Sequence, residues 1–267
     1  MISLQAVLLT SDFCGRHLRI GIGCLKDPEK VAASALRFSE ESGAHVICYT
    51  DLSSSSDALG GDVIRSEHPE VSLIDDLFSG KIDAAVRGSL PANSTLSYLK
   101  KKYGVPALRR IALLETPAGE QFFFAPVGVD EGWCVEDKEA FVKEGRRYAK
   151  ACGLPEKTVV LAGGRAGDVG RHPAVDKSIS DAEEVCRRTG AEFGEILIED
   201  AVHDAGVIIA PDGISGNLIF RTLALLGTGA GLGAPVVNIP DIYVDSSRAS
   251  ESYDAVLRFT ARLVSMK

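Results

Sequence analysis

"HLRIGIGCLKDPEKVAASALRFSEESGAHVICYTD" (residues 17–51) contains a strand, a helix and a second strand in succession. Its two ends, residues 17–23 and 45–51, are short apolar runs that predict strands. The segment between them predicts a helix that starts with Asp27 as N-cap and stops at Gly43. Two strands joined by a helix in this way are expected to pair in parallel. The stretch therefore predicts an α/β fold.

The same alternation continues along the chain. Near-continuous apolar strands separated by helices imply a parallel sheet with helices on both faces. The strands around residue 118 look paired through a turn, and the glycine-rich stretch 227–235 is interpreted as a helix C-cap and tight turn. We expect further helices at 71–80, 91–104, 134–153, 178–190, 215–227 and 250–267, and strands at 81–87, 109–116, 120–128, 157–164, 195–200, 205–213 and 234–240.

Composition limits the partners of the chain. Its 267 residues are 45% apolar and 25% charged with a net charge of −8, which excludes a general basic surface for nucleic acid or anionic membrane. No apolar run is long enough to span a membrane, and the N-terminus lacks the basic region of a signal peptide. The cysteines form no CxxC pair and no metal-ligand spacing with the histidines. We therefore expect a cytoplasmic protein with buried free thiols and no metal site.

Polar residues that follow strands mark the candidate binding sites, because ligands of open α/β sheets collect beyond the carboxyl ends of the strands. "VRGSL" places Arg87 and Ser89 at such a position. "AGGRAGDVGR" (162–171) combines glycines, whose N–H groups can approach an anion, with arginines that can hold phosphate in a fork. It lacks the Gly-Lys-Ser/Thr ending of a Walker A loop, and a solvated loop is the alternative.

"PDGISGN" (211–217) joins a strand to a helix and has two interpretations. In the first, Asp212 or Ser215 caps the helix and the glycines serve the turn. In the second, an anion or nucleotide rests at the helix N-terminus.

The C-terminal part of the chain, over residues 205–267, resembles the phosphate acetyl/butyryltransferase family. The resemblance rests on Gly216–Asn217 opening a helix, the turn Gly229–Pro235, Ser247–Arg248, and the following Asp254. "DGISGN" is also similar to the acyl-carrier-protein phosphate acyltransferases. Within the first family the chain resembles the compact branch found in methanogens, known as MtxX or methanogenesis marker protein 4 and labelled methyltransferase-related.

The resemblance implies an isocitrate/isopropylmalate dehydrogenase-like fold, with two three-layer αβα domains, an interdomain cleft and a homodimer. The first domain would comprise residues 1–106 plus 241–267. The second, 107–240, would carry the GGRAGDVGR and DGISGN loops.

The resemblance also implies roles for individual residues. Ser247 would stabilise a departing thiolate, Arg248 would clamp phosphate, and Asp254 would help to deprotonate it. CoA or acyl-CoA would be a substrate, with no tightly bound cofactor. The candidate substrate- or phosphate-binding residues are Arg87, Ser89, Gly163, Gly164, Arg165, Arg171, Asp212, Gly216 and Asn217.

Three functions stay open at this point. The first is a transferase of the phosphate acyltransferase type that acts on a small anionic, phosphorylated or CoA-like ligand. GGRAGDVGR stands where the family has Ser/Thr-rich turns, and VRGSL stands where it has a small-residue turn. The arginines at both positions favour a ligand with more negative charge than acetyl phosphate. The second is a methyltransferase, or a methyltransferase-associated protein, of methanogenic C1 metabolism, although the chain has no corrinoid motif Asp-x-His-x-x-Gly. The third is a non-catalytic ligand sensor, for which Asp254 would be unnecessary.

Overall fold

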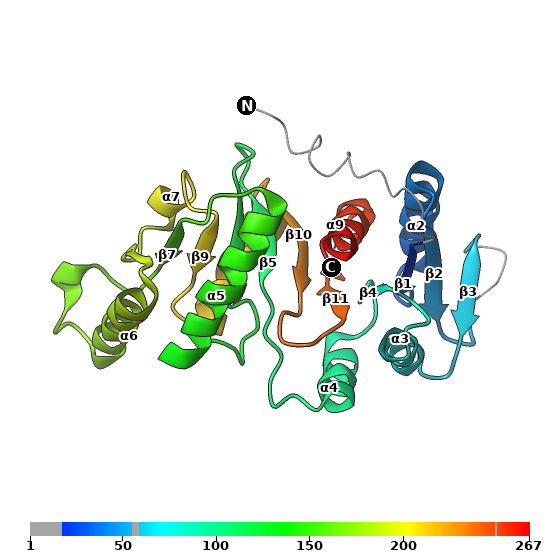
Figure 1. Ribbon diagram of the computed structural model, residues 1–267, viewed down its shortest axis with the longest axis horizontal. Coiled ribbons are helices and arrows are strands. Elements are labelled where there is room, and N and C mark those ends of the chain that lie inside the picture. The colour runs from blue at the N-terminus through cyan, green and yellow to red at the C-terminus, as the bar shows by residue number, and fades with distance from the viewer. Residues whose placement is uncertain (1–17, 55–58, 249) are drawn as a thin grey trace. The chain divides into compact units, whose positions relative to one another are not determined.

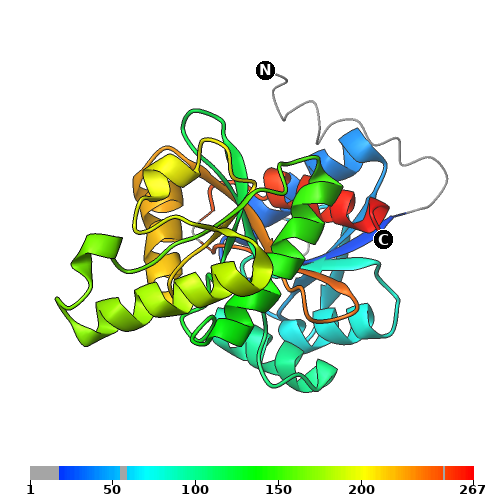
Figure 2. The ribbon, with the colours of Figure 1, turned by 60° about the vertical axis from the view of Figure 1, so that its left-hand side comes forward.

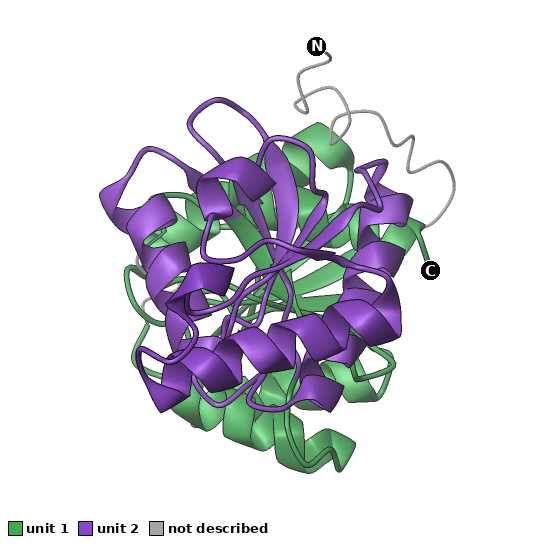
Figure 3. Ribbon diagram, turned by 90° about the vertical axis from the view of Figure 1, so that its left-hand side faces the viewer, with its two compact units in different colours: residues 1–108, 232–267 green, residues 109–231 purple. Residues whose placement is uncertain are grey.

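The computed structural model describes residues 18–54, 59–248 and 250–267 (Figure 1). The chain forms two compact units, which are coloured separately in Figure 3. Unit 1 comprises residues 1–108 and 232–267, and unit 2 comprises residues 109–231. The family resemblance places the divisions at 106/107 and 240/241 instead. Cys14 and the predicted strand start at His17 lie outside the described residues.

Unit 1 contains a mostly parallel sheet with helices on both faces. Figure 1 shows α2 and α9 together on one face and α3 and α4 on the other. Only β10 runs antiparallel to its neighbour in this set, with Ala234 opposite Asp245. The strands lie in the order β3 (Asp62–Arg65), β2 (His45–Thr50), β1 (Arg19–Gly23), β4 (Ala84–Val86), β11 (Ile242–Asp245) and β10 (Ala230–Pro235), and the helices are α2 (Pro28–Ser42), α3 (Pro69–Phe78), α4 (Ala92–Tyr103) and α9 (Asp254–Ser265).

The β1–α2–β2 unit confirms the α/β fold predicted from residues 17–51. β1 and β2 pair in parallel with Ile22 opposite Cys48, and Ile20 and Ile22 are fully buried. α2 ends at Gly43, whose φ of 70° is the left-handed conformation that glycine adopts without strain. Asp27 occupies the N-cap position but makes no side-chain cap, because its own backbone is left-handed. The predicted capping by Asp27 is therefore wrong.

The strands of unit 2 are built on an antiparallel hairpin, as the sequence predicts. β5 and β6 pair antiparallel, and the other pairs in this unit are parallel. α5 and α6 pack against each other (Figure 2). The strand order is β5 (Ala112–Glu115), β6 (Gln121–Ala125), β9 (Val207–Ile209), β7 (Thr158–Val160) and β8 (Glu192–Phe193), and the helices are α5 (Val135–Cys152), the 3-10 helix η2 (Ala166–Asp168), α6 (Pro173–Thr189), α7 (Ile198–Ala201), α8 (Gly213–Arg221) and the π-helix η3 (Thr222–Leu226).

Three local predictions are wrong. The strand expected at 234–240 does not form there, because β10 ends at Pro235 and a bend follows over 237–240. Residues 195–200 do not form a strand, because Glu195 has a φ of 52° that ends the extended backbone, and the helix α7 follows. The glycine-rich stretch 227–235 is a strand over Ala230–Pro235, where a tight turn was expected. At Gly233 a side chain would collide with Val244, so its small size lets β10 lie against β11.

Other side chains add little to the sequence-based view. Among the described cysteines, which are all free, Cys24 and Cys48 are buried as expected, whereas Cys134 is exposed. Within the described part of the chain, no three His, Cys, Asp or Glu side chains gather as metal ligands would. The same residues include no helix with the length and apolar character needed to cross a membrane.

Candidate functional site

Three parallel strand ends meet at one edge of unit 1. β4 pairs with both β1 and β11, so that Gly23 and Asp245, which end β1 and β11, and Arg87, which follows β4, lie at the ends of neighbouring strands. The Ser89 N–H donates to the Gly23 carbonyl over 2.9 Å, and the Ser246 hydroxyl donates to the Gly88 carbonyl over 3.1 Å. The structure therefore brings together the "VRGSL" and "VDSSR" junctions, which are far apart in the sequence.

Gly88 permits this close approach of the strand ends. Its φ is 59°, and a side chain there would begin only 2.0 Å from the Gly23 carbonyl oxygen. Only glycine satisfies both conditions. The Leu25 N–H then donates to the Ser89 hydroxyl over 2.8 Å, which fixes the chain after β1.

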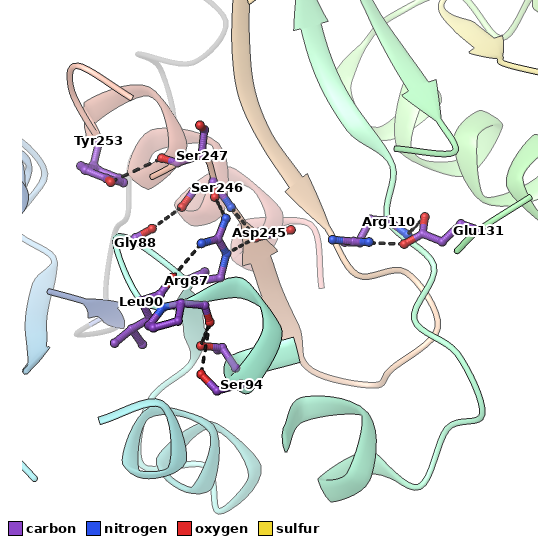
Figure 4. A network of polar contacts seen from close by, with 12 residues as sticks. Arg87, Gly88, Leu90, Ser94, Arg110, Glu131, Asp245, Ser246, Ser247 and Tyr253 are labelled. Atoms are coloured by element: carbon purple, nitrogen blue, oxygen red, sulfur yellow. Dashed lines mark hydrogen bonds and ion pairs between the residues drawn. The ribbon is translucent and has the colours of Figure 1, made fainter. Parts of the chain in front are cut away.

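Arg87 is the central side chain of this network (Figure 4). It is only 6% exposed, and all three guanidinium nitrogens donate to protein oxygens. Nε bonds the Asp245 carboxylate, Nη1 bonds the Leu90 carbonyl over 2.8 Å, and Nη2 bonds the Ser246 carbonyl. The guanidinium thus holds the backbone after β11 in place. A direct contact between Arg87 and a ligand stays a prediction.

Ser247 and Arg248 follow this anchored segment. The Ser247 carbonyl accepts hydrogen bonds from the Tyr253 hydroxyl (3.4 Å) and the Ser250 N–H (3.3 Å). Burial raises the pKa of Tyr253 to about 12, so its hydroxyl stays a donor at neutral pH. Arg248 is exposed, in contrast to Arg87. The turn therefore combines a fixed backbone with an outward-facing cation.

Asp254, the first residue of α9, is held by α2. Its carboxylate accepts hydrogen bonds from Arg37 Nη2 (2.7 Å), from the Ser34 hydroxyl (3.4 Å) and from the Ser252 hydroxyl. Burial raises the pKa of Asp254, but the bonds from Arg37 and Ser252 outweigh it, so the pKa lies below its ordinary value. Asp254 is therefore a charged but weak base at neutral pH.

The lowered pKa of Asp254 predicts a pH-dependent contribution to stability. A carboxyl group with a lower pKa in the folded state stabilises the fold above its unfolded pKa, near 3.8, and this contribution disappears as the pH falls through the folded value. Urea unfolding should show wild type more stable than Asp254→Asn at pH 7, with the gap closing towards pH 3. A gap that is equal at both pH values would contradict this account.

In unit 2 the 162–171 loop follows β7, and protein side chains accept hydrogen bonds from four of its backbone N–H groups. Arg171 pairs with Asp168, and both arginines of the loop, Arg165 and Arg171, have exposed side chains. An anion that bound the loop amides would have to displace these acceptors. The bonds run from Gly163 to the Ser178 hydroxyl (2.8 Å), from Arg165 to Asp168 (2.9 Å), from Ala166 to Glu195 (2.8 Å) and from Gly170 to Asp176 (2.7 Å).

The "DGISGN" segment has a structural explanation. Asp212 accepts hydrogen bonds from the N–H (2.8 Å) and the hydroxyl (2.9 Å) of Ser215, which confirms that it caps α8. Asn217 donates to the Val127 carbonyl over 2.8 Å. At Gly216, a side chain would begin 1.9 Å from the Pro126 carbonyl oxygen. These contacts hold α8 against the loop after β6. A ligand-binding role for these residues stays a prediction.

Sequence reasoning missed the partners that hold the site. Arg37 and Ser34 bond Asp254 across more than 200 residues of sequence, so no local pattern links them. In unit 2 it missed buried Glu131, which accepts a bond from Arg110 Nε over 2.7 Å. Burial raises the pKa of Glu131 although Arg110 opposes the change. The only sequence signal for Glu131 was its place as a carboxylate within the glycine-rich turn "GVDEG".

Comparison with solved structures defines the class of fold. The chain is similar to a branched-chain phosphotransacylase from Enterococcus faecalis V583, with a TM-score of 0.73, 18% identity and coverage of 92% of this chain and 99% of that one. It is also similar to a phosphotransacetylase from Streptococcus pyogenes, with a TM-score of 0.74, 16% identity and full coverage of both chains. The fold is therefore the α/β fold of the phosphotransacylases, as the resemblance predicts.

Sequence comparison then gives the family. The chain is 40% identical over 253 residues to a Methanosarcina mazei protein described as "Putative methyltransferase mtx subunit X", covering 92% of this chain and 90% of that protein. A Methanosarcina barkeri protein of the same description is 38% identical over 252 residues, covering 92% and 93% respectively. This chain belongs to the mtx subunit X family of methanogens, and the predicted membership is confirmed. No family model in the scan matches the chain.

Proposed function

We propose that the chain is a cytoplasmic transferase of the phosphate acyltransferase type that acts on a small anionic, phosphorylated or CoA-like ligand. The Ser247–Arg248 turn carries this proposal, because it lies at the carboxyl edge of parallel strands and buried Arg87 anchors it. That edge is where α/β sheets bind ligands. The fold shared with phosphotransacylases supports the same class of chemistry by analogy.

In the proposed reaction a phosphate oxygen attacks the thioester carbonyl, the carbon–sulfur bond breaks, and the thiolate leaves. Exposed Arg248 would bind the attacking phosphate, and the Ser247 hydroxyl would donate a hydrogen bond to the thiolate. Asp254 would help to remove the phosphate proton. Because Arg37 and Ser252 lower the pKa of Asp254, this help requires that the carboxylate first leave these partners. Arg87 and Ser89 would hold the turn in position.

Unit 2 would supply the remaining ligand contacts. Exposed Arg165 and Arg171 would make these contacts, because they add the cationic charge that a heavily phosphorylated ligand needs. Gly163, Gly164, Asp212, Gly216 and Asn217 would shape this part of the site. The isocitrate dehydrogenase-like arrangement, the interdomain cleft and the homodimer are kept from the family resemblance as parts of the proposal.

Release of free thiol from acyl-CoA tests this function. Wild type should release thiol only when phosphate is present, for at least one acyl-CoA of a short-chain and branched-chain panel. Asp254→Asn should slow the release by about 10²–10⁴-fold, the usual contribution of general-base help. Asp204→Asn, at an exposed carboxylate that pairs with Lys157, is the matched control and should not change the rate. The proposal would be overturned if no acyl-CoA of the panel gave phosphate-dependent thiol release, or if Asp254→Asn were as active as wild type.

A methyltransferase function is the second candidate, because the relatives carry that description. Thermal-shift measurements with CoA, acetyl phosphate, S-adenosylmethionine and methanopterin analogues separate the candidates. Transfer of a labelled methyl group from a donor that stabilises the protein would favour this second function. Stabilisation by a ligand without turnover under any pairing would favour a sensor.

A further inference from the structure

Arg37 bonds both carboxylate oxygens of Asp254, the proposed base. Its Nη2 donates to Oδ2 over 2.7 Å and its Nε donates to Oδ1 over 3.3 Å. Two bonds of this kind fix the geometry of the pair and compensate the charge of the carboxylate. While the pair stays intact, the carboxylate accepts a proton poorly. We call Arg37, Ser34 and Asp254, which join α2 to α9, the α2–α9 latch.

Ser34 connects this latch to the Ser247–Arg248 turn. Ser34 is fully buried, and its hydroxyl donates to Asp254 over 3.4 Å. The same oxygen accepts hydrogen bonds from Arg37 Nη2 (3.2 Å) and from the Tyr253 N–H (3.1 Å). The Tyr253 hydroxyl in turn bonds the Ser247 carbonyl (Figure 4). The latch and the proposed ligand-binding turn are therefore linked through one tyrosine residue.

A ligand can reach the latch from solvent. The Arg37 side chain is 52% exposed and that of Asp254 is 27% exposed. Exposed ion pairs contribute little to stability, because water competes for both partners. A phosphate dianion offers the guanidinium more negative charge than one carboxylate does, and it can accept two of its hydrogen bonds in a fork. The exchange of Asp254 for phosphate as the partner of Arg37 therefore costs little.

Two other arginines of unit 1 are paired with carboxylates of their own. Arg258 pairs with Glu41 across α9 and α2, and buried Arg87 pairs with Asp245 at the end of β11. Neither pair includes Asp254. The β4 strand, which also packs against α9, consists of Ala84–Val86 and carries no titratable side chain. Release of the latch arginine therefore leaves the Asp254 carboxylate without its ion pair.

We propose that a phosphate opens the α2–α9 latch by taking Arg37 from Asp254, and that the freed carboxylate then accepts the phosphate proton. This inference rests on the proposed function and names what activates its base. As the phosphate oxygen bonds the thioester carbon, its O–H bond breaks and the proton passes to an Asp254 oxygen. The carbon–sulfur bond breaks, and its electron pair leaves with the thiolate. The proton returns to solvent when the products leave.

The latch would make the activity of the base depend on the presence of its acceptor. An unpaired carboxylate beside a bound thioester would also activate water, and the thioester would then be hydrolysed without phosphate. With the latch closed, Asp254 stays paired until phosphate arrives. Binding of the correct acceptor thus completes the catalytic group, as in other enzymes that use substrate binding for specificity.

Isothermal titration of inorganic phosphate at pH 7 tests the latch without any turnover. Arg37→Gln should weaken phosphate binding by at least about tenfold, because it removes hydrogen bonds from a charged group. Asp254→Asn should instead tighten the binding by up to about fivefold, because no ion pair then has to be broken. Arg258→Met, which removes the neighbouring α9–α2 pair with Glu41, is the matched control and should bind phosphate like wild type.

The double variant separates partner exchange from simple charge repulsion. In the Arg37→Gln background, Asp254→Asn should change phosphate affinity by no more than about twofold, because no latch remains to be opened. A gain of affinity in the single Asp254→Asn variant cannot come from misfolding. The latch would be refuted if wild type bound no phosphate, if Arg37→Gln bound it like wild type, or if Asp254→Asn gave no gain or the same gain in both backgrounds. Absence of thiol release with the expected affinities would refute the proposed function alone.

Discussion

Arg87→Met should destabilise the protein by about 3–5 kcal/mol, the usual cost of removing one partner of a buried ion pair. The substitution leaves the Asp245 carboxylate, whose side chain is 13% exposed, without its guanidinium. It also removes the donors to the Leu90 and Ser246 carbonyls. Urea unfolding followed by circular dichroism measures the change in the free energy of unfolding.

Two further variants show whether the destabilisation by Arg87→Met comes from loss of its buried ion pair. Arg187→Met removes an exposed pair with Glu184 and should leave the unfolding midpoint nearly unchanged. Arg87→Met combined with Asp245→Asn should be less destabilised than the sum of the two single variants, because residues in one network are not additive. Additive effects, or a stable Arg87→Met, would show that the guanidinium does not hold the strand ends together.

Gly216→Ala should also be strongly destabilising, although alanine favours helices. In an open helix this change gains about 1 kcal/mol. Here the new side chain would begin 1.9 Å from the Pro126 carbonyl oxygen, which belongs to backbone and cannot rotate away. Forced overpacking of this kind costs about 1–3 kcal/mol or more, and would push α8 away from the loop after β6.

The matched control is Gly167→Ala in the 3-10 helix of unit 2. No atom lies within 4 Å of the position that its side chain would take. Thermal unfolding should show a lower midpoint for Gly216→Ala and an unchanged or slightly higher one for Gly167→Ala. Equal midpoints in the two variants would contradict the close packing of α8 on the loop after β6.

The sequence predicts those parts of the fold that depend on local patterns. The strand–helix–strand unit of residues 17–51 follows from apolar runs and from Gly43, which the structure shows in the left-handed conformation. Residues 195–200 misled the prediction, because their apolar pattern suits a strand and only the backbone of Glu195 prevents one. Positive φ at a residue other than glycine leaves no clear mark in a single sequence.

The position of the candidate site was predictable from the sequence, but the hydrogen bonds and ion pairs that hold it were not. The polar residues that follow strands gave the edge on which Arg87, Ser89 and Ser246 come together. They did not reveal that Arg87 would be buried and bonded to protein oxygens, or that Arg37 would hold Asp254. Such contacts join residues that are distant in sequence, and they depend on packing that one-dimensional patterns do not contain.

Isothermal titration of acetyl phosphate and of CoA into the protein tests most directly the claim that the Ser247–Arg248 turn binds an anion. We expect wild type to bind at least one of them. Arg248→Met should weaken that binding by at least about tenfold, because hydrogen bonds to charged groups contribute about 1.5–3 kcal/mol. Arg258→Met, which removes a pair with Glu41 in the same unit, should bind like wild type. Equal affinity of wild type and Arg248→Met for the ligand that binds would contradict the account.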